Sequence, residues 1–172
     1  FTARSTAGFV RNSGILRPGQ ADRVDQAYAL YRSREAHPRG IEATLFRAMY
    51  SVEPRIRFIG VWDTVGALGV PLNGLRFFNI VNRRNQFHDT DLSTSVDAAF
   101  QALANDEKRK PFRAAIWNKQ DSTISQDVEQ VWIAGVHCDV GGGYKQNEIA
   151  DIPRVGLLTK ATEYRRALDE AA

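Results

Sequence analysis

The sequence predicts an α/β protein in which a mostly parallel sheet is flanked by helices. Two near-continuous apolar runs, at 56–62 and 131–136, have the composition of strands that are covered on both faces. Segments with helical spacing of apolar residues precede, separate and follow these runs, and strands that alternate with helices usually form parallel sheets. With 172 residues and no internal repeat, we expect residues 1–172 to form a single domain with its own core.

The helices follow from apolar spacing and from the residues that end them. Residues 2–13 should form the first helix, because Gly14 is a residue type favoured just after a helix end. A second helix within residues 20–35 and a third after the break at "HPRG" are indicated by apolar residues three or four apart, namely Val24, Ala27, Tyr28, Tyr31, Ile41, Leu45, Ala48 and Met49.

Two further helices are expected in the second half of the chain. Ser93 would be the N-cap of a helix with one apolar face, formed by Val96, Ala99, Phe100 and Leu103. The last helix should run from about Pro153 to the end of the chain. Between the first strand and Ser93 lies a long connection, residues 64–92.

Composition excludes several classes of function. The net charge is +3, and the basic clusters "NRRNQ" and "EKRKPFR" are short and flanked by acids, which favours a solvated surface over a nucleic-acid partner. No apolar run reaches the ~18 residues of a transmembrane helix. The single cysteine, Cys138, excludes an intrachain disulfide and a thiolate-rich zinc site. Nothing in the sequence indicates a cofactor.

Two residues able to perform acid–base chemistry follow the two expected strands. Asp63 ends "RIRFIGVWD", and His137 ends the run in "QVWIAGVHCDVGGGYK", where three glycines then allow the chain to bend away. Because ligand sites of parallel sheets gather beyond the carboxyl ends of the strands, both side chains should face one crevice. Asp63 could equally cap a turn, and His137 could be a structural histidine.

Other interpretations of this region remain open at this point. Asp139 could join Asp63 and His137 in a site for a hard metal ion. The glycines could cradle a phosphate, although Lys145 is not placed as in a P-loop. Cys138 is expected to be an inert thiol that points away from the imidazole, since neighbouring strand residues face opposite sides. His37 and His88 are expected in loops.

Asp63 followed by His137 matches the last two members of an α/β-hydrolase triad, which run in the order Ser, Asp or Glu, His. A scan for the G-x-S-x-G elbow of the nucleophile finds none. Ser5 and Ser13 lie in the expected first helix and lack flanking glycines. The residues therefore offer a base and the carboxylate that orients it, but no visible nucleophile.

Four segments resemble the α/β-hydrolase family that contains the type VI secretion phospholipase effectors and many uncharacterised bacterial and fungal proteins. They are "FTARSTAGFVRNSGIL", "RIRFIGVWDTVGALGVP", "VDAAFQALANDEKRKPFRAAIW" and "QVWIAGVHCDVGGGY", in the family's order. The segment "IADIPRVGLLTKA" resembles the one that follows the histidine block. Cys138 stands where the family usually has serine, a swap that should be tolerated.

The resemblance implies a partial α/β-hydrolase-like fold and a serine esterase or phospholipase in which Asp63 is the triad acid and His137 the base. A "GFSRGA"-like segment with the nucleophilic serine would precede Phe1, so residues 1–172 would be the C-terminal portion of the catalytic domain and inactive alone. The implied partner is an ester or phospholipid substrate, with contact to a membrane surface; a cytoplasmic or a secreted effector is compatible with this.

Two questions stay open in the sequence. The chain could be a non-catalytic α/β interaction module, or a metal-dependent hydrolase built on Asp63, His137 and Asp139. The apolar connection from Gly66 to Leu92, which contains Phe77 and Phe78, could line an acyl-chain groove, with Arg83 and Arg84 near lipid headgroups. It could equally complete the core beside the sheet.

Overall fold

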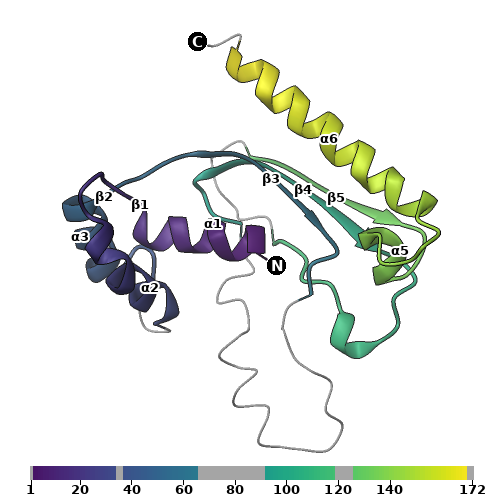
Figure 1. Cartoon of the computed structure of the whole chain (residues 1–172), viewed down its shortest axis with the longest axis horizontal. Helices are drawn as coiled ribbons and strands as arrows, with labels where there is room; N and C mark the ends of the chain where they lie inside the picture. Colours follow the sequence, from purple (N-terminus) through teal and green to yellow (C-terminus); the bar gives the residue numbers. More distant parts are fainter. Residues whose placement is uncertain (1, 34–36, 66–91, 119–125, 170–172) are drawn as a thin grey trace, which may run out of the picture.

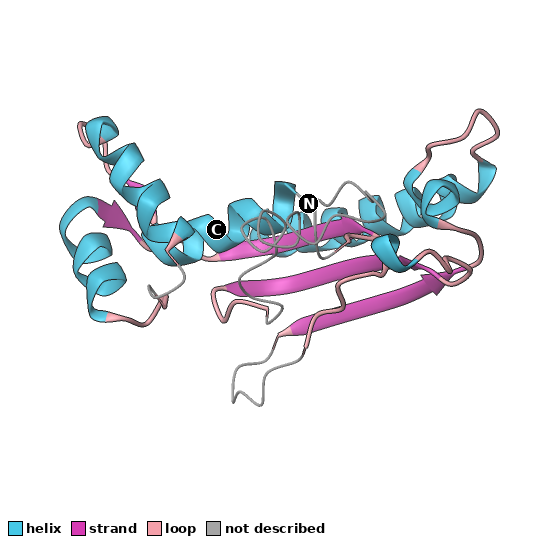
Figure 2. Ribbon diagram, turned by 90° about the horizontal axis from the view of Figure 1, so that it is seen from below, coloured by secondary structure: helices cyan, strands magenta, loops and turns pink. Residues whose placement is uncertain are grey.

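In the computed structural model, residues 2–33, 37–65, 92–118 and 126–169 are described (Figure 1). Their centre is a three-stranded sheet of β3 (Ile56–Trp62), β4 (Val96–Ala104) and β5 (Asp127–Ile133) in the order β3-β4-β5. Both pairings are parallel, with Ile59 opposite Ala99 and Ala99 opposite Val128. The three strands run side by side in Figure 2, and the predicted α/β class with a parallel sheet flanked by helices is confirmed.

The predicted helix after Ser93 is wrong, because Val96–Ala104 is the central strand β4. The backbone of this segment is occupied on both sides by β3 and β5, so its residues alternate between the two faces of the sheet. Ser93 caps no helix; its hydroxyl accepts the Ser95 N–H at 3.2 Å in the turn that leads into the strand. The apolar residues Val96, Ala99, Phe100 and Leu103 gave the segment helical spacing, and pairing with two strands overrode that pattern.

Three helices precede the sheet, as predicted. The first, α1 (Thr2–Ser13), ends at Gly14, which has φ +71°, and α2 (Val24–Arg32) follows a short 3₁₀ turn, η1 (Ala21–Arg23). The third, α3 (Ile41–Tyr50), leads into β2 (Ser51–Val52), which pairs antiparallel with β1 (Ile15–Leu16). A Cβ on Gly14 would lie 2.7 Å from Ser51 Cβ, so this crossing requires glycine.

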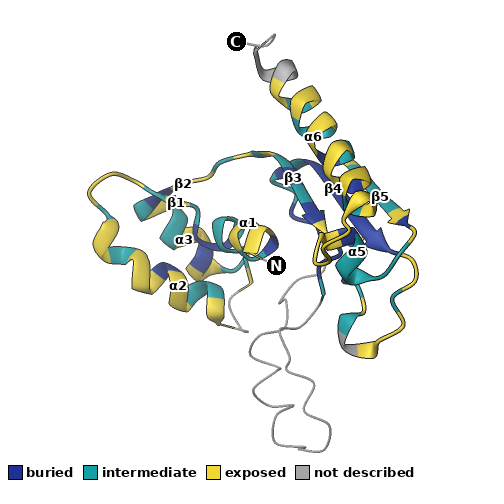
Figure 3. Ribbon diagram, turned by 45° about the vertical axis from the view of Figure 1, so that its right-hand side comes forward, coloured by how far each residue is buried: buried dark blue, intermediate teal, exposed yellow. Residues whose placement is uncertain are grey.

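The helices cover the sheet in two layers. Ala7 of α1 packs on the face that carries Ile59 and Val61, whereas Leu157 of α6 (Glu148–Asp169) packs on the opposite face beside Phe100. Figure 1 shows α6 crossing one side of the strands and α1 the other, and in Figure 3 β4 is buried while the outer side of α6 is exposed. The core therefore lies on both faces of β4.

The chain beyond β5 differs from the prediction in two details. The strand ends at Ile133, and His137 is the first residue of a short helix, α5 (His137–Gly141), rather than the last residue of the strand. The last helix begins at Glu148, five residues before Pro153. In Figure 1, α5 lies at the end of the sheet to which the strand arrows point, which is the edge where the sequence places chemistry.

The proposed groove-lining connection falls on residues 66–91, outside the described part of the chain, as do Phe77, Phe78, Arg83, Arg84 and His88. Its last residue, Leu92, is buried in the core cluster with Ile59 and Val96. Among the described residues, no helix combines the length and the apolar composition that crossing a bilayer requires.

Candidate active site

Asp63 is the first residue after β3 and is 1% exposed. Its backbone N–H donates to Ala102 O at 2.7 Å, and its Oδ1 accepts the Ala104 N–H at 2.9 Å, so both groups are bound to the end of β4. The residue has φ +30°, a left-handed conformation that a non-glycine residue adopts only where its surroundings enforce it. The buried carboxylate is thus held against the end of the neighbouring strand β4.

His137 meets the free oxygen of that carboxylate. Its Nδ1 lies 2.7 Å from Asp63 Oδ2, and its side chain is 29% exposed against 2% for that of Asp63. Because a carboxylate oxygen can only accept, Nδ1 carries the hydrogen, and Nε2 is the nitrogen that holds a lone pair in the neutral ring. None of the hydrogen bonds found among the described residues uses Nε2.

A tight turn delivers His137 from the strand to the carboxylate. Gly135 has φ +113°, and a Cβ at this position would lie 2.7 Å from Asp139 Cβ. Asp139 Oδ2 accepts the Val136 N–H at 2.9 Å, which closes the first turn of α5 around the histidine. The bend before His137 is therefore made at Gly135, and Gly142, one of the three glycines expected to turn the chain away, ends α5 with φ +74°.

Three residues that sequence reasoning missed surround the histidine. Glu107 Oε2 accepts the backbone N–H of His137 at 3.3 Å and also binds Arg109 Nη2 at 2.7 Å. The Arg109 guanidinium lies 4.0 Å from the centroid of the Phe112 ring, and that ring lies 5.2 Å from the imidazole. One sequence feature could have identified these residues. The charged run "DEKRKPF" follows β4 closely, and recognition of that strand would have placed the run at the same edge of the sheet as Asp63 and His137.

The remaining candidates do not meet at the site as a metal centre would require. Asp139 is engaged with the backbone of Val136, and within the described ranges no three His, Cys, Asp or Glu side chains gather to hold a metal ion. Cys138 is partly buried in α5, so the alternation expected of strand residues does not apply to it. His37 lies in an exposed turn, where its Nδ1 accepts the Arg39 N–H.

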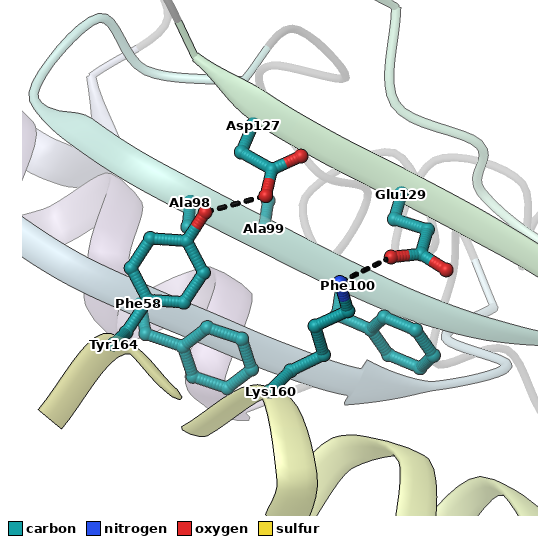
Figure 4. Close-up of a pocket in the computed structure, with 8 residues that line it drawn as sticks. All are labelled: Phe58, Ala98, Ala99, Phe100, Asp127, Glu129, Lys160 and Tyr164. Atoms are coloured by element: carbon teal, nitrogen blue, oxygen red, sulfur yellow. Dashed lines mark hydrogen bonds and ion pairs between the residues drawn. The ribbon is translucent and has the colours of Figure 1, made fainter. Parts of the chain in front are cut away.

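A second group of polar side chains lies at the opposite end of the strands. Figure 4 shows a shallow hollow between α6 and the sheet, in which Tyr164 hydrogen-bonds to Asp127 and Lys160 pairs with Glu129 at 3.0 Å. Asp127 begins β5, whereas His137 follows its end. Each polar group in this hollow is used to fasten α6 to the sheet, so it is not a rival active site.

A parallel sheet whose strand ends bring a buried aspartate onto a part-exposed histidine defines the class: an α/β protein with a carboxylate–imidazole pair at the carboxyl ends of its strands. The chain belongs to the family described as the catalytic domain of Tle1-like phospholipase effectors of the type VI secretion system, whose model matches residues 1–160. Its family is one of hydrolases of the lipase or phospholipase type, as the resemblance implied. Searches of the curated proteins and of the solved structures found no match.

Proposed function

We propose that Asp63 and His137 are the acid and the base of a Ser–His–Asp triad that hydrolyses carboxylic ester bonds of phospholipids. The observation that carries this proposal is the 2.7 Å contact between His137 Nδ1 and Asp63 Oδ2, made by a buried carboxylate whose other oxygen is held by the Ala104 N–H. The family supports the lipid substrate.

In this mechanism, His137 Nε2 takes the proton from the serine hydroxyl as the serine oxygen attacks the ester carbonyl. The protonated ring then gives that proton to the leaving alcohol oxygen, and an acyl-enzyme remains. In the second half, Nε2 takes a proton from water, whose oxygen attacks the acyl carbonyl, and the serine regains its hydrogen. Asp63 stabilises the imidazolium formed in each half and keeps Nδ1 protonated.

The nucleophile is proposed to lie outside these 172 residues, in a segment that precedes Phe1. Two observations support this: the sequence contains no G-x-S-x-G elbow, and no serine of the described residues hydrogen-bonds to His137 Nε2. Residues 1–172 would then be the C-terminal portion of the catalytic domain. One oxyanion-hole donor, the backbone N–H after the serine, would belong to the same proposed segment. The 172 residues alone should hydrolyse no ester.

The decisive experiment labels the parent protein, including the upstream segment, with a fluorophosphonate probe. Strong labelling of an upstream serine in wild type, lost in His137→Ala, is expected, because only an activated serine reacts quickly. The Asp63→Asn variant should keep the fold while kcat falls on the order of 10⁴-fold, since the ring would adopt the wrong tautomer. Labelling that persists in His137→Ala would overturn the proposed base.

A matched control uses the other described histidine. His37→Ala removes an imidazole from an exposed turn, so labelling and kcat should equal those of wild type. A well-folded parent protein that takes no label at all would instead favour the non-catalytic interaction module. Release of free fatty acid from phosphatidylcholine vesicles by wild type, but not by His137→Ala, would identify the substrate class.

A further inference from the structure

The segment that follows β4 continues its hydrogen bonding along the turn that precedes His137. We call residues 105–112 the latch segment. The Asn105 N–H donates to Ile133 O at 2.9 Å and the Asp106 N–H donates to Gly135 O at 3.0 Å. In return, the Gly135 N–H donates to Asp106 Oδ2 at 2.7 Å. The latch segment therefore fixes the turn from which the histidine projects.

Glu107 extends this contact to the histidine itself. Its side chain is 4% exposed, and its two oxygens accept hydrogen bonds from Arg109 Nε at 2.9 Å, Arg109 Nη2 at 2.7 Å and the His137 N–H at 3.3 Å. The paired guanidinium is the main cause that lowers the pKa of Glu107 to about 2, so the carboxylate stays charged at neutral pH. A charged acceptor makes the stronger kind of hydrogen bond to a backbone N–H.

Phe112 holds the same residue from the side of its ring. The Phe112 and His137 rings lie with centroids 5.2 Å apart and planes at 53°. The Arg109 guanidinium lies 4.0 Å from the centroid of the Phe112 ring, in the geometry of a cation–π contact, and it also hydrogen-bonds to Glu107. The backbone of His137 thus contacts Glu107 and its ring contacts Phe112, and Arg109 binds both of these residues.

We propose that Glu107 and Phe112 are positioning residues for His137, which act through its backbone and its imidazole ring respectively, with Arg109 joining the two. This inference rests on the proposed function, because it assigns the cluster a role in holding the triad base. A part-exposed imidazole can rotate about its side-chain bonds, and each rotation breaks the Nδ1–Oδ2 contact with Asp63. An apolar ring tilted against the imidazole removes those rotamers without offering a competing hydrogen bond.

The effect of such residues falls on the chemical step. A base displaced by about 1 Å can cost up to about 10²-fold in rate, whereas binding of substrate is unaffected by rotation of the base. In the parent protein, Phe112→Ala should therefore lower kcat by about 10- to 10²-fold on p-nitrophenyl butyrate while KM stays the same. Phe112→Tyr, which keeps the ring, should restore kcat.

Controls from the same segment separate positioning from a general loss of structure. Lys108→Ala changes an exposed residue of the latch segment and should leave kcat and the melting temperature as in wild type. Glu107→Gln keeps an acceptor for the His137 N–H but removes the charge that binds Arg109, so its kcat should fall less than that of Glu107→Ala. A Phe112→Ala protein with unchanged kcat in an active parent would overturn the proposal.

A second measurement does not depend on esterase activity. Diethylpyrocarbonate modifies accessible imidazoles, and peptide mass spectrometry can compare its rate at His137 with that at His37 in the same sample. The ratio should rise several-fold in Phe112→Ala, with an unchanged circular dichroism spectrum, and return to the wild-type value in Phe112→Tyr.

The two measurements fail separately. An unchanged modification ratio would refute the positioning role, whatever the activity of the parent protein. A raised ratio in a parent that takes no fluorophosphonate label would refute the proposed function while supporting the positioning of His137 by the ring.

Discussion

Leu157 of α6 lies directly over Gly60 of β3, in the space that a side chain at position 60 would occupy. A Cβ built on Gly60 would stand 2.1 Å from Leu157 Cδ2 and 3.0 Å from the Phe58 ring. The helix can pack this closely on the sheet only because residue 60 has no side chain.

Gly60→Ala should therefore destabilise the protein by about 1–3 kcal/mol, because one methyl group forces Leu157 out of its rotamer. Urea denaturation would measure the change as a lower midpoint at constant slope. Gly141→Ala is the matched control, since a Cβ there meets nothing within 4 Å. If Leu157→Ala in the Gly60→Ala background failed to recover part of the loss, the contact would not be the cause.

The turn before His137 gives a second prediction. Gly135→Ala combines a left-handed φ of +113° with a clash against Asp139 Cβ, and residues forced into such a conformation cost about 1–3 kcal/mol. The bond between the Val136 N–H and Asp139 Oδ2 should break, and His137 should shift from Asp63. The esterase activity of the parent protein should fall by more than the loss of folded protein, calculated from the melting temperature, explains. Equal activity after correction for the folded fraction would contradict this.

Acid should weaken the latch segment through Glu107. Its pKa is lowered to about 2 in the folded chain, mainly by the hydrogen bond from Arg109, against 4.5 in the unfolded chain. The stabilisation is thus fully present above about pH 4.5 and is lost as the pH falls toward 2. Wild type should lose more stability than Glu107→Gln between pH 6 and pH 3 in urea denaturation.

A comparison with Asp97 tests whether that acid effect belongs to Glu107. Burial raises the pKa of Asp97, but hydrogen bonds from Arg55 and Arg57 outweigh it and lower the pKa overall. The pKa of Asp97, at the other end of the sheet, is therefore also lowered on folding. Asp97→Asn should remove only the part of the acid-dependent stability loss that comes from Asp97 and leave the part from Glu107. If Glu107→Gln left the acid dependence of wild type unchanged, the Glu107–Arg109 pair would not contribute.

Tyr164 offers a prediction on the alkaline side. Burial and the hydrogen bond to Asp127 raise its pKa to about 12. The stabilisation is fully present below the unfolded value of 10 and is lost as the pH rises through 12. Absorbance at 295 nm should show a late tyrosine ionisation in wild type that Tyr164→Phe lacks. A late step that survives in Tyr164→Phe would assign it to another tyrosine.

Strand β3 and the helices α1, α2, α3 and α6 could be predicted from the sequence, because their patterns are local, whereas the short helix α5 was not predicted. β3 is a near-continuous apolar run, and the end of α1 is marked by Gly14. β5 was predicted only in part, because it begins at Asp127, before the apolar run, and includes Glu129 and Gln130. β4 could not be predicted, since the apolar residues of "VDAAFQALA" have helical spacing and the segment becomes a strand only through pairing on both sides. Because β4 was predicted as a helix, nothing in the sequence indicated that residues 105–112, the latch segment, lie at the end of a strand near His137.

The candidate site was predictable in part for a similar reason. Asp63 and His137 follow two parallel strands, and topology alone brings such residues to the same edge of a sheet. The contacts of Glu107, Arg109 and Phe112 depend on side-chain packing after β4, and no spacing rule reports that. Asp139 was considered as a metal ligand, but its use as a cap depends on the turn at Gly135.

The end of β4 positions both residues of the Asp63–His137 pair. Ala102 O and the Ala104 N–H hold Asp63, and the next two residues, Asn105 and Asp106, hold the turn that carries His137. Asp63 and the turn that carries His137 are thus both held by one stretch of five residues, 102–106. The distance between Asp63 and His137 is therefore set at the end of β4, the strand that the core covers on both faces.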